Sequence, residues 1–199
     1  MSDTRYIPDG ECERELNVRN SKFIGLAVPA EDPEQARNII RETREKYSGC
    51  THVVYAFITG GEKSEISGMS DDGEPKGTAG RPVMEVLKGR GVVNVLVMIV
   101  RYFGGTKLGT GGLVKAYGDC AKAVLSALKV RELVVSVDFR LNVPYRLQRA
   151  VTNAIGEAGG EVADIKFADE VEIAGSVPEA GIVELRKKIE DISRGGLSI

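Results

Sequence analysis

The stretch VVNVLVMIVRYFGGTKLGTGG, from Val92 to Gly112, carries the clearest fold signal in the chain. Its first part is an unbroken apolar run, which is typical of a β-strand buried on both faces. Five glycines then fall within nine residues, and a long helical pattern begins behind them. The order strand, glycine loop, helix is the placement that phosphate binding needs, because glycines let the backbone approach a ligand closely.

Upstream of this stretch, the patterns predict alternating strands and helices. Alternating apolar residues favour a hairpin, and Asp32 and Pro33 are expected to cap and begin the following helix. The next helix has Pro82 in its first turn and Gly89 at its expected exit. The expected elements are a hairpin over residues 12–30, a helix over 33–47, strands over 51–60 and 65–68, and a helix over 81–91.

Downstream, the pattern restarts near Val130. A strand, a helix, a hairpin across Ala168 and Asp169, and a last helix follow in turn. This β-α-β-β-α order is ferredoxin-like. We therefore predict an α+β protein with an N-terminal domain over residues 1–132 and a C-terminal ferredoxin-like domain over 133–199.

Composition indicates an ordinary soluble protein. The chain has 199 residues, of which 42% are hydrophobic and 28% charged, and its net charge of −2 argues against a strongly basic nucleic-acid binder. No apolar run reaches membrane-spanning length, and the polar start favours a cytoplasmic location. Three scattered cysteines and one histidine form no metal-binding pattern, so neither a metal nor a cofactor is expected.

The average charge hides a local asymmetry. Nine basic and two acidic residues lie between Lys76 and Lys129, whereas five acidic residues and one basic residue lie between Glu62 and Glu74. Lys107 falls on the glycine loop 104–112 and Lys115 on the helix behind it, where unpaired N–H groups and the helix dipole favour anions. A solvated helix face explains the same charges equally well.

The glycine loop matches no standard nucleotide motif. Neither GxxxxGK[ST] nor GxGxxG can be read in it, so phosphate binding and a tight structural turn both remain open. Valine at Gly105 or Gly111 is expected to disturb the loop, because β-branched residues tolerate positive φ poorly. The candidate ligand-binding glycines are Gly104, Gly105, Gly109, Gly111 and Gly112.

A second polar loop, SDDGEPKGTAGRP, spans Ser70 to Pro82. Asp71, Asp72 and Glu74 have the chemistry to bind a divalent ion or to act as acid and base, but a capped, hydrogen-bonded loop is the favoured interpretation. Thr78 or Gly80 is expected to cap the next helix. Thr78 and Arg81 complete the candidate ligand-binding residues of this loop.

Other candidates lie at strand ends. His52 starts a strand and has no nucleophile placed beside it in a motif, so a hydrogen-bonded structural role is favoured over catalysis. Arg101, Tyr102 and Phe103 end the buried strand, where they could stack on bases or close the end of the sheet. We include all four in the candidate ligand-binding set, and no catalytic residue is assigned.

Both loops together carry a family resemblance. SKFIGLAVPA, THVVYAF, SDDGEPKGTAGRPVMEVL and RYFGGTKLGTGGLVKAYGDCAKAV resemble the YigZ/Impact family, in family order over residues 15–130. The resemblance implies a ribosomal-protein-type βαβ fold for the first domain and an elongation-factor-G-like fold for residues 135–199. Eukaryotic Impact proteins act in translational control with a different companion domain, so their partner system is not transferred to this chain.

Two functions follow as hypotheses. The first is a non-catalytic binding protein that acts on RNA, the ribosome or a translation factor, with a phosphate-bearing ligand held between the two loops. The second is a phosphate- or nucleotide-binding enzyme that uses loop 104–112 for phosphate and loop 71–74 for magnesium or proton transfer.

Overall fold

The computed structural model describes residues 5–61 and 64–199, and it is a mixed α+β structure. The chain divides into two compact units, one ending at Leu133 and the other running from Val134 to Ile199. Each unit has hydrophobic cores of its own. None of the described helices is long and apolar enough to cross a membrane.

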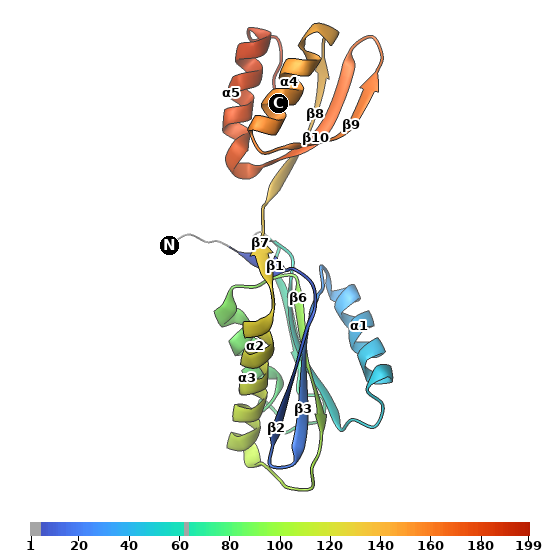
Figure 1. Cartoon of the computed structure of the whole chain (residues 1–199), viewed down its shortest axis with the longest axis vertical. Helices are drawn as coiled ribbons and strands as arrows, with labels where there is room; N and C mark the ends of the chain where they lie inside the picture. Colours follow the sequence, from blue (N-terminus) through green and yellow to red (C-terminus); the bar gives the residue numbers. More distant parts are fainter. Residues whose placement is uncertain (1–4, 62–63) are drawn as a thin grey trace. The chain divides into compact units, whose positions relative to one another are not determined.

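The N-terminal unit is built on a five-stranded sheet (Figure 1). Its strand order is β2-β3-β6-β4-β5, and all hydrogen-bonded neighbours are antiparallel. β3 and β4 both pair with β6 and so run parallel to each other, with α1 crossing between them. The strands are β2 (Cys12–Val18), β3 (Ser21–Pro29), β4 (His52–Thr59), β5 (Ile66–Ser70) and β6 (Val95–Tyr102).

Helices cover both faces of this sheet. α1 (Pro33–Lys46) lies on one face, and α2 (Gly80–Arg90) and α3 (Gly109–Ala127) lie on the other (Figure 1). The apolar run of β6 is therefore buried on both faces, as expected, although its neighbours are antiparallel rather than parallel. Helices on both faces, and not parallel pairing, explain its continuous hydrophobicity.

The helix ends follow the sequence signals in part. The Asp32 side chain accepts hydrogen bonds from the backbone N–H groups of Glu34 and Gln35, both at 2.8 Å, so the predicted cap of α1 is confirmed. The predicted exit of α2 at Gly89 is wrong. Gly91 ends this helix with φ of 63°, a left-handed conformation that glycine adopts at low cost.

α3 packs against β3 through small residues. A Cβ built on Gly25 of β3 would lie 3.0 Å from the Cys120 sulfur, so the glycine makes room for the helix. Burial raises the pKa of the Cys120 thiol to about 12. Cys120 is thus a small core residue.

A short ribbon that the sequence patterns missed completes the N-terminal unit. β1 (Tyr6–Pro8) pairs antiparallel with β7 (Val130–Glu132). Three-residue strands carry too little alternation to be recognised from sequence alone.

The C-terminal unit is the predicted ferredoxin-like fold. Its antiparallel sheet has the order β8-β10-β9, with α4 and α5 on one face (Figure 1). Apolar side chains such as Val143, Ile155, Ile173 and Leu185 fill the core between them. The elements are β8 (Ser136–Val143), η1 (Tyr145–Leu147), α4 (Gln148–Glu157), β9 (Glu161–Phe167), β10 (Val171–Pro178), η2 (Glu179–Gly181) and α5 (Ile182–Ser193).

Candidate ligand-binding site

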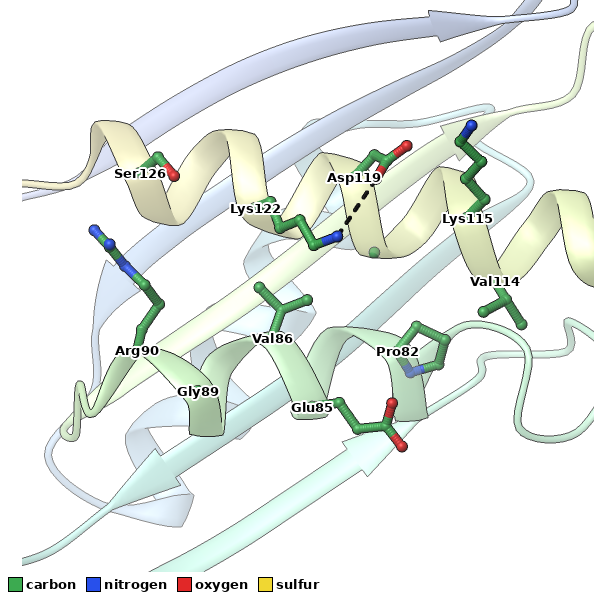
Figure 2. A pocket seen from close by; sticks show the side chains of 11 residues that line it. Pro82, Glu85, Val86, Gly89, Arg90, Val114, Lys115, Asp119, Lys122 and Ser126 are labelled. Carbon is green, nitrogen blue, oxygen red and sulfur yellow. Dashed lines mark ion pairs between the residues drawn. The ribbon is translucent and has the colours of Figure 1, made fainter.

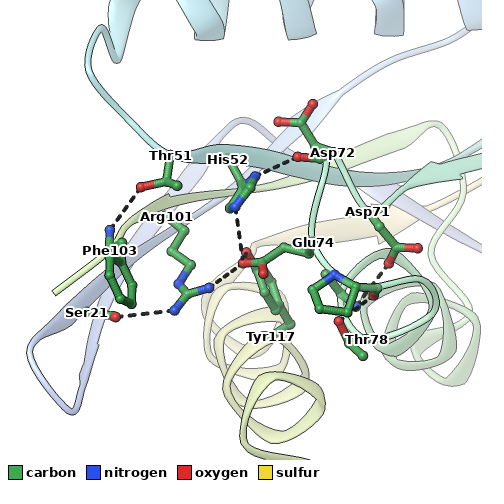
Figure 3. A network of polar contacts seen from close by, with 12 residues as sticks. Ser21, Thr51, His52, Asp71, Asp72, Glu74, Thr78, Arg101, Phe103 and Tyr117 are labelled. Atoms are coloured by element: carbon green, nitrogen blue, oxygen red, sulfur yellow. Dashed lines mark hydrogen bonds and ion pairs between the residues drawn. The ribbon is translucent and has the colours of Figure 1, made fainter. Parts of the chain in front are cut away.

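A buried carboxylate organises the end of β6 (Figure 3). The Glu74 side chain is buried, and its Oε1 atom accepts hydrogen bonds from Arg101 Nη1 at 2.5 Å and from the Tyr117 hydroxyl at 2.7 Å. His52 Nε2 lies 3.9 Å from the same oxygen. Burial, followed by the hydrogen bond to Glu74, raises the pKa of Tyr117 well above its usual value, so Tyr117 stays a neutral donor.

Arg101 sits inside this network and not on an open surface. Its exposed fraction is 5%, and its guanidinium lies over the rings of Phe23 and Phe103 at 5.3 and 5.6 Å. Nη2 donates to Ser21 Oγ at 3.4 Å, while buried Nε has no hydrogen-bond partner among the described residues. Glu74 neutralises Arg101, so Arg101 closes the end of the sheet, one of the two roles that the sequence left open.

Asp71 caps α2 from a distance. Its carboxylate accepts hydrogen bonds from the N–H groups of Gly77 at 2.8 Å, Ala79 at 3.1 Å and Gly80 at 2.8 Å. The predicted cap at Thr78 or Gly80 is wrong, since the Thr78 hydroxyl donates to the Pro75 carbonyl instead. Partial burial would raise the pKa of Asp71, but the three N–H donors together outweigh it and lower the pKa.

Asp72 ties the same loop to β4 and α1. Its carboxylate accepts from the Val53 N–H at 2.5 Å and pairs with Arg44. His52 Nδ1 lies 2.6 Å from the Asp72 carbonyl oxygen, and because a carbonyl only accepts, Nδ1 must carry the proton. His52 is thus a hydrogen-bonded structural residue, as favoured from the sequence.

The three carboxylates therefore do not converge on one point. Asp71 faces the start of α2, Asp72 faces β4 and α1, and Glu74 faces Arg101 and Tyr117. Within residues 5–61 and 64–199, no cluster of His, Cys, Asp and Glu side chains is arranged to hold a metal ion. The alternative hypothesis, magnesium on loop 71–74, gains no support from this geometry.

A hollow of about 340 Å³ opens above the buried network, between the end of β6 and the start of α3. We call it the β6-end hollow. Phe103, a residue that is 48% exposed, lines it, and Lys107 contributes a cation. The lining residues are Glu74, Pro75, Arg101, Phe103, Lys107, Leu108, Gly109, Thr110 and Leu113.

The start of α3 supplies this hollow with backbone donors. α3 begins at Gly109, and no side chain caps its first N–H groups. Uncapped N–H groups at a helix start attract anions, and the helix dipole adds to the attraction. The hollow therefore combines donors, the Lys107 charge and an aromatic face.

The glycines of the loop 104–112 play different parts. A Cβ on Gly104 would lie 2.0 Å from the Asn20 carbonyl oxygen, so this position admits glycine alone. Gly105 and Gly109 have φ of 82° and 74°. Gly111 and Gly112 lie inside α3 without positive φ, so the predicted loop 104–112 is too long and the backbone argument for Gly111 is wrong.

Lys115 lies on a different surface from Lys107. It lines a groove of about 680 Å³ between α2 and α3, which we call the helix groove (Figure 2). Lys122 in this groove pairs with Asp119 at 3.7 Å. The structure thus separates the two lysines that the sequence analysis grouped in one site.

The remaining predicted residues lie outside the hollow. Arg81 pairs with Glu85 at 2.9 Å on the exposed face of α2. Tyr102 packs against the core on the α1 side of the sheet. Ser21, Phe23 and Tyr117 of the network were missed by sequence reasoning, since Tyr117 reads as one more apolar position of α3.

Comparison with known proteins identifies both units. Residues 19–125 match the family model described as the Impact N-terminal domain, and residues 141–195 match a domain of unknown function, DUF1949. The IMPACT family member YigZ of Escherichia coli (strain K12) is 32% identical over 92% of this chain and 90% of its own length. The Protein IMPACT of Oryctolagus cuniculus is 32% identical over 62% of this chain and 39% of its own length.

A solved structure matches the whole chain. The protein titled "Crystal structure of an hypothetical protein" is 30% identical, covers 100% of this chain and 97% of its own, and superposes with a TM-score of 0.73. Both units therefore occur together in an experimentally determined relative.

Proposed function

Because the chain belongs to the Impact family, we propose that it is a non-catalytic binding protein that acts in the regulation of translation. The proposed ligand is a phosphate-bearing segment of RNA, held in the β6-end hollow. Translational control is the role that the family resemblance implies for the eukaryotic members, and the hollow provides the chemistry that would contact RNA.

One observation carries the proposal: Phe103, Lys107 and the uncapped start of α3 line the same hollow. A phosphate would accept hydrogen bonds from the N–H groups of this helix end, and Lys107 would add a direct charge contact. The exposed Phe103 ring offers a face on which one base can stack, without regard to sequence.

The charges around the hollow favour binding of one phosphate group over general binding along a nucleic-acid backbone. Glu74 neutralises Arg101 beneath the hollow, and Asp71 and Asp72 are held by other partners nearby. Among the described residues that line the hollow, Lys107 is the one cation without an ion-pair partner, and one cation binds a single phosphate group better than a long stretch of backbone. We therefore expect contact with an exposed, unpaired nucleotide of a folded RNA.

The test compares Lys107, which lies just before α3, with Lys115, which lies inside α3. Lys107→Ala should weaken binding to a short single-stranded RNA and reduce the salt slope by about one unit, as expected for one lost phosphate contact. Lys115→Ala is the matched control, because Lys115 lines the helix groove instead. Equal affinity and salt dependence in wild type and Lys107→Ala would contradict the proposal.

Phe103→Ala separates stacking from charge. It should weaken RNA binding by about 1–3 kcal/mol while leaving the salt slope unchanged. If a mononucleotide displaces the RNA, that result would instead favour the nucleotide-binding alternative.

A further inference from the structure

β8 leaves one long edge of the C-terminal sheet unpaired. All eight of its residues, Ser136 to Val143, pair with β10 on one side, and no strand of the described chain pairs with the other side. An unpaired edge presents a row of N–H and C=O groups that can bind another strand. This edge is therefore available for adding a strand to the sheet.

The opposite edge of the same sheet differs. The pairing of β9 with β10 shifts register between Ala174 and Gly175, whereas β8 pairs with β10 without a break. β9 also carries Glu161, Asp164 and Lys166. Irregular pairing and charge are the means by which natural sheets block edge-to-edge association. β8 contains no proline and no irregularity, and its two charges, Asp138 and Arg140, have opposite signs, so its edge is less protected than that of β9.

The side chains of β8 alternate between two environments. Asp138 and Arg140 are exposed, while Phe139, Leu141 and Val143 are buried under the helices. If two copies of β8 pair antiparallel with Phe139 opposite Phe139, Asp138 of each copy faces Arg140 of the other. The strand is then complementary to itself, because both charged cross-strand pairs join opposite charges, and the polar residues Ser136 and Asn142 face each other beside them.

We infer that β8 binds β8 of a second copy of this chain, joining two three-stranded sheets into one six-stranded sheet. The interface is isologous: the same strand edge serves both subunits about a two-fold axis. Arg140 is available for it, since its contact with Glu172 within the subunit is 3.8 Å long and its side chain is largely exposed.

The mass of the full-length protein in solution tests this inference. Sedimentation equilibrium should show a concentration-dependent rise toward twice the 21.4 kDa mass of one chain. Asp138→Lys and Arg140→Glu each place like charges opposite one another in both pairs, so each should raise the dimer dissociation constant about tenfold. The double variant Asp138→Lys, Arg140→Glu restores opposite charges and should restore the dimer.

Lys166→Glu on β9 is the control for a charge reversal at the other edge, and it should leave the dimer unchanged. Circular dichroism of every variant separates loss of pairing from loss of folding. A wild-type protein that stays at 21.4 kDa at all concentrations would overturn the inference. So would a dimer that tolerates both single reversals, or a folded double variant that stays monomeric.

Discussion

At the residue scale, the end of β6 depends on one buried ion pair. Glu74 and Arg101 are 8% and 5% exposed, and Tyr117 and Ser21 complete the hydrogen bonding of the pair. Loss of either partner of a buried ion pair leaves an uncompensated charge inside the fold, which is strongly destabilising. The pair therefore fixes the floor of the β6-end hollow more than it provides a free charge to a ligand.

Removing one partner of this pair should be costly. Glu74→Gln leaves the Arg101 guanidinium buried without a counter-charge, and we expect a loss of about 3 kcal/mol in the free energy of unfolding. Glu85→Gln, which breaks the exposed pair with Arg81, is the matched control and should cost less than about 1 kcal/mol. Urea unfolding followed through the amide signals of β6 measures both, and similar losses would refute the buried-pair account.

Asp71 should make stability depend on pH. Its pKa in the folded protein is lowered, so its contribution is fully present above about pH 5 and is lost as the pH falls through the folded-state pKa. Asp71→Asn should cost roughly 1 kcal/mol at pH 7, as for a lost helix cap. The difference from wild type should shrink below about pH 4. A difference that stays constant from pH 7 to pH 3 would mean that ionised Asp71 gives no extra stability.

At the element scale, strong periodic patterns were predictable and side-chain partnerships were not. The apolar run of β6 predicted a buried strand, and Asp32 followed by Pro33 predicted the start of α1. The distant cap of α2 by Asp71 could not be predicted, because the loop's own turn brings residues nine positions apart together. The separation of Lys107 from Lys115 also depends on where α3 begins, and helix starts among glycines carry weak signals.

The glycines near α3 should respond in opposite directions to alanine. Gly104→Ala places a methyl group against the Asn20 backbone, so the free energy of unfolding should fall by more than 1 kcal/mol, roughly the scale of overpacking. Gly111→Ala meets open space in a helical conformation and should stabilise by up to about 1 kcal/mol. Thermal unfolding of both variants gives the two signs, and equal shifts would show that the close approach at Gly104 is unimportant.

At the scale of the whole molecule, two units with separate cores follow one another along the chain. The sequence indicated this division near Val130, because a new series of strand and helix patterns begins there. We propose that the two units also unfold separately, since no core cluster is shared between them.

Core substitutions should therefore act on one unit at a time. Ile173→Ala removes a fully buried side chain of the C-terminal core and should destabilise that unit by about 2–5 kcal/mol. Leu96→Ala should do the same in the N-terminal unit. Hydrogen exchange read by mass spectrometry should show faster exchange confined to the substituted unit. Faster exchange throughout the chain after either change would mean that the units unfold together.

Amide NMR of the full-length protein, during titration with a short single-stranded RNA, shows whether RNA binds in the proposed β6-end hollow. If RNA binds there, the largest shift changes should fall on Phe103 to Gly112, around Lys107 and the start of α3. Amides of the helix groove, near Val86 and Lys122, should change little. Saturable changes centred on the helix groove or on the C-terminal sheet, with residues 103–112 unaffected, would contradict it.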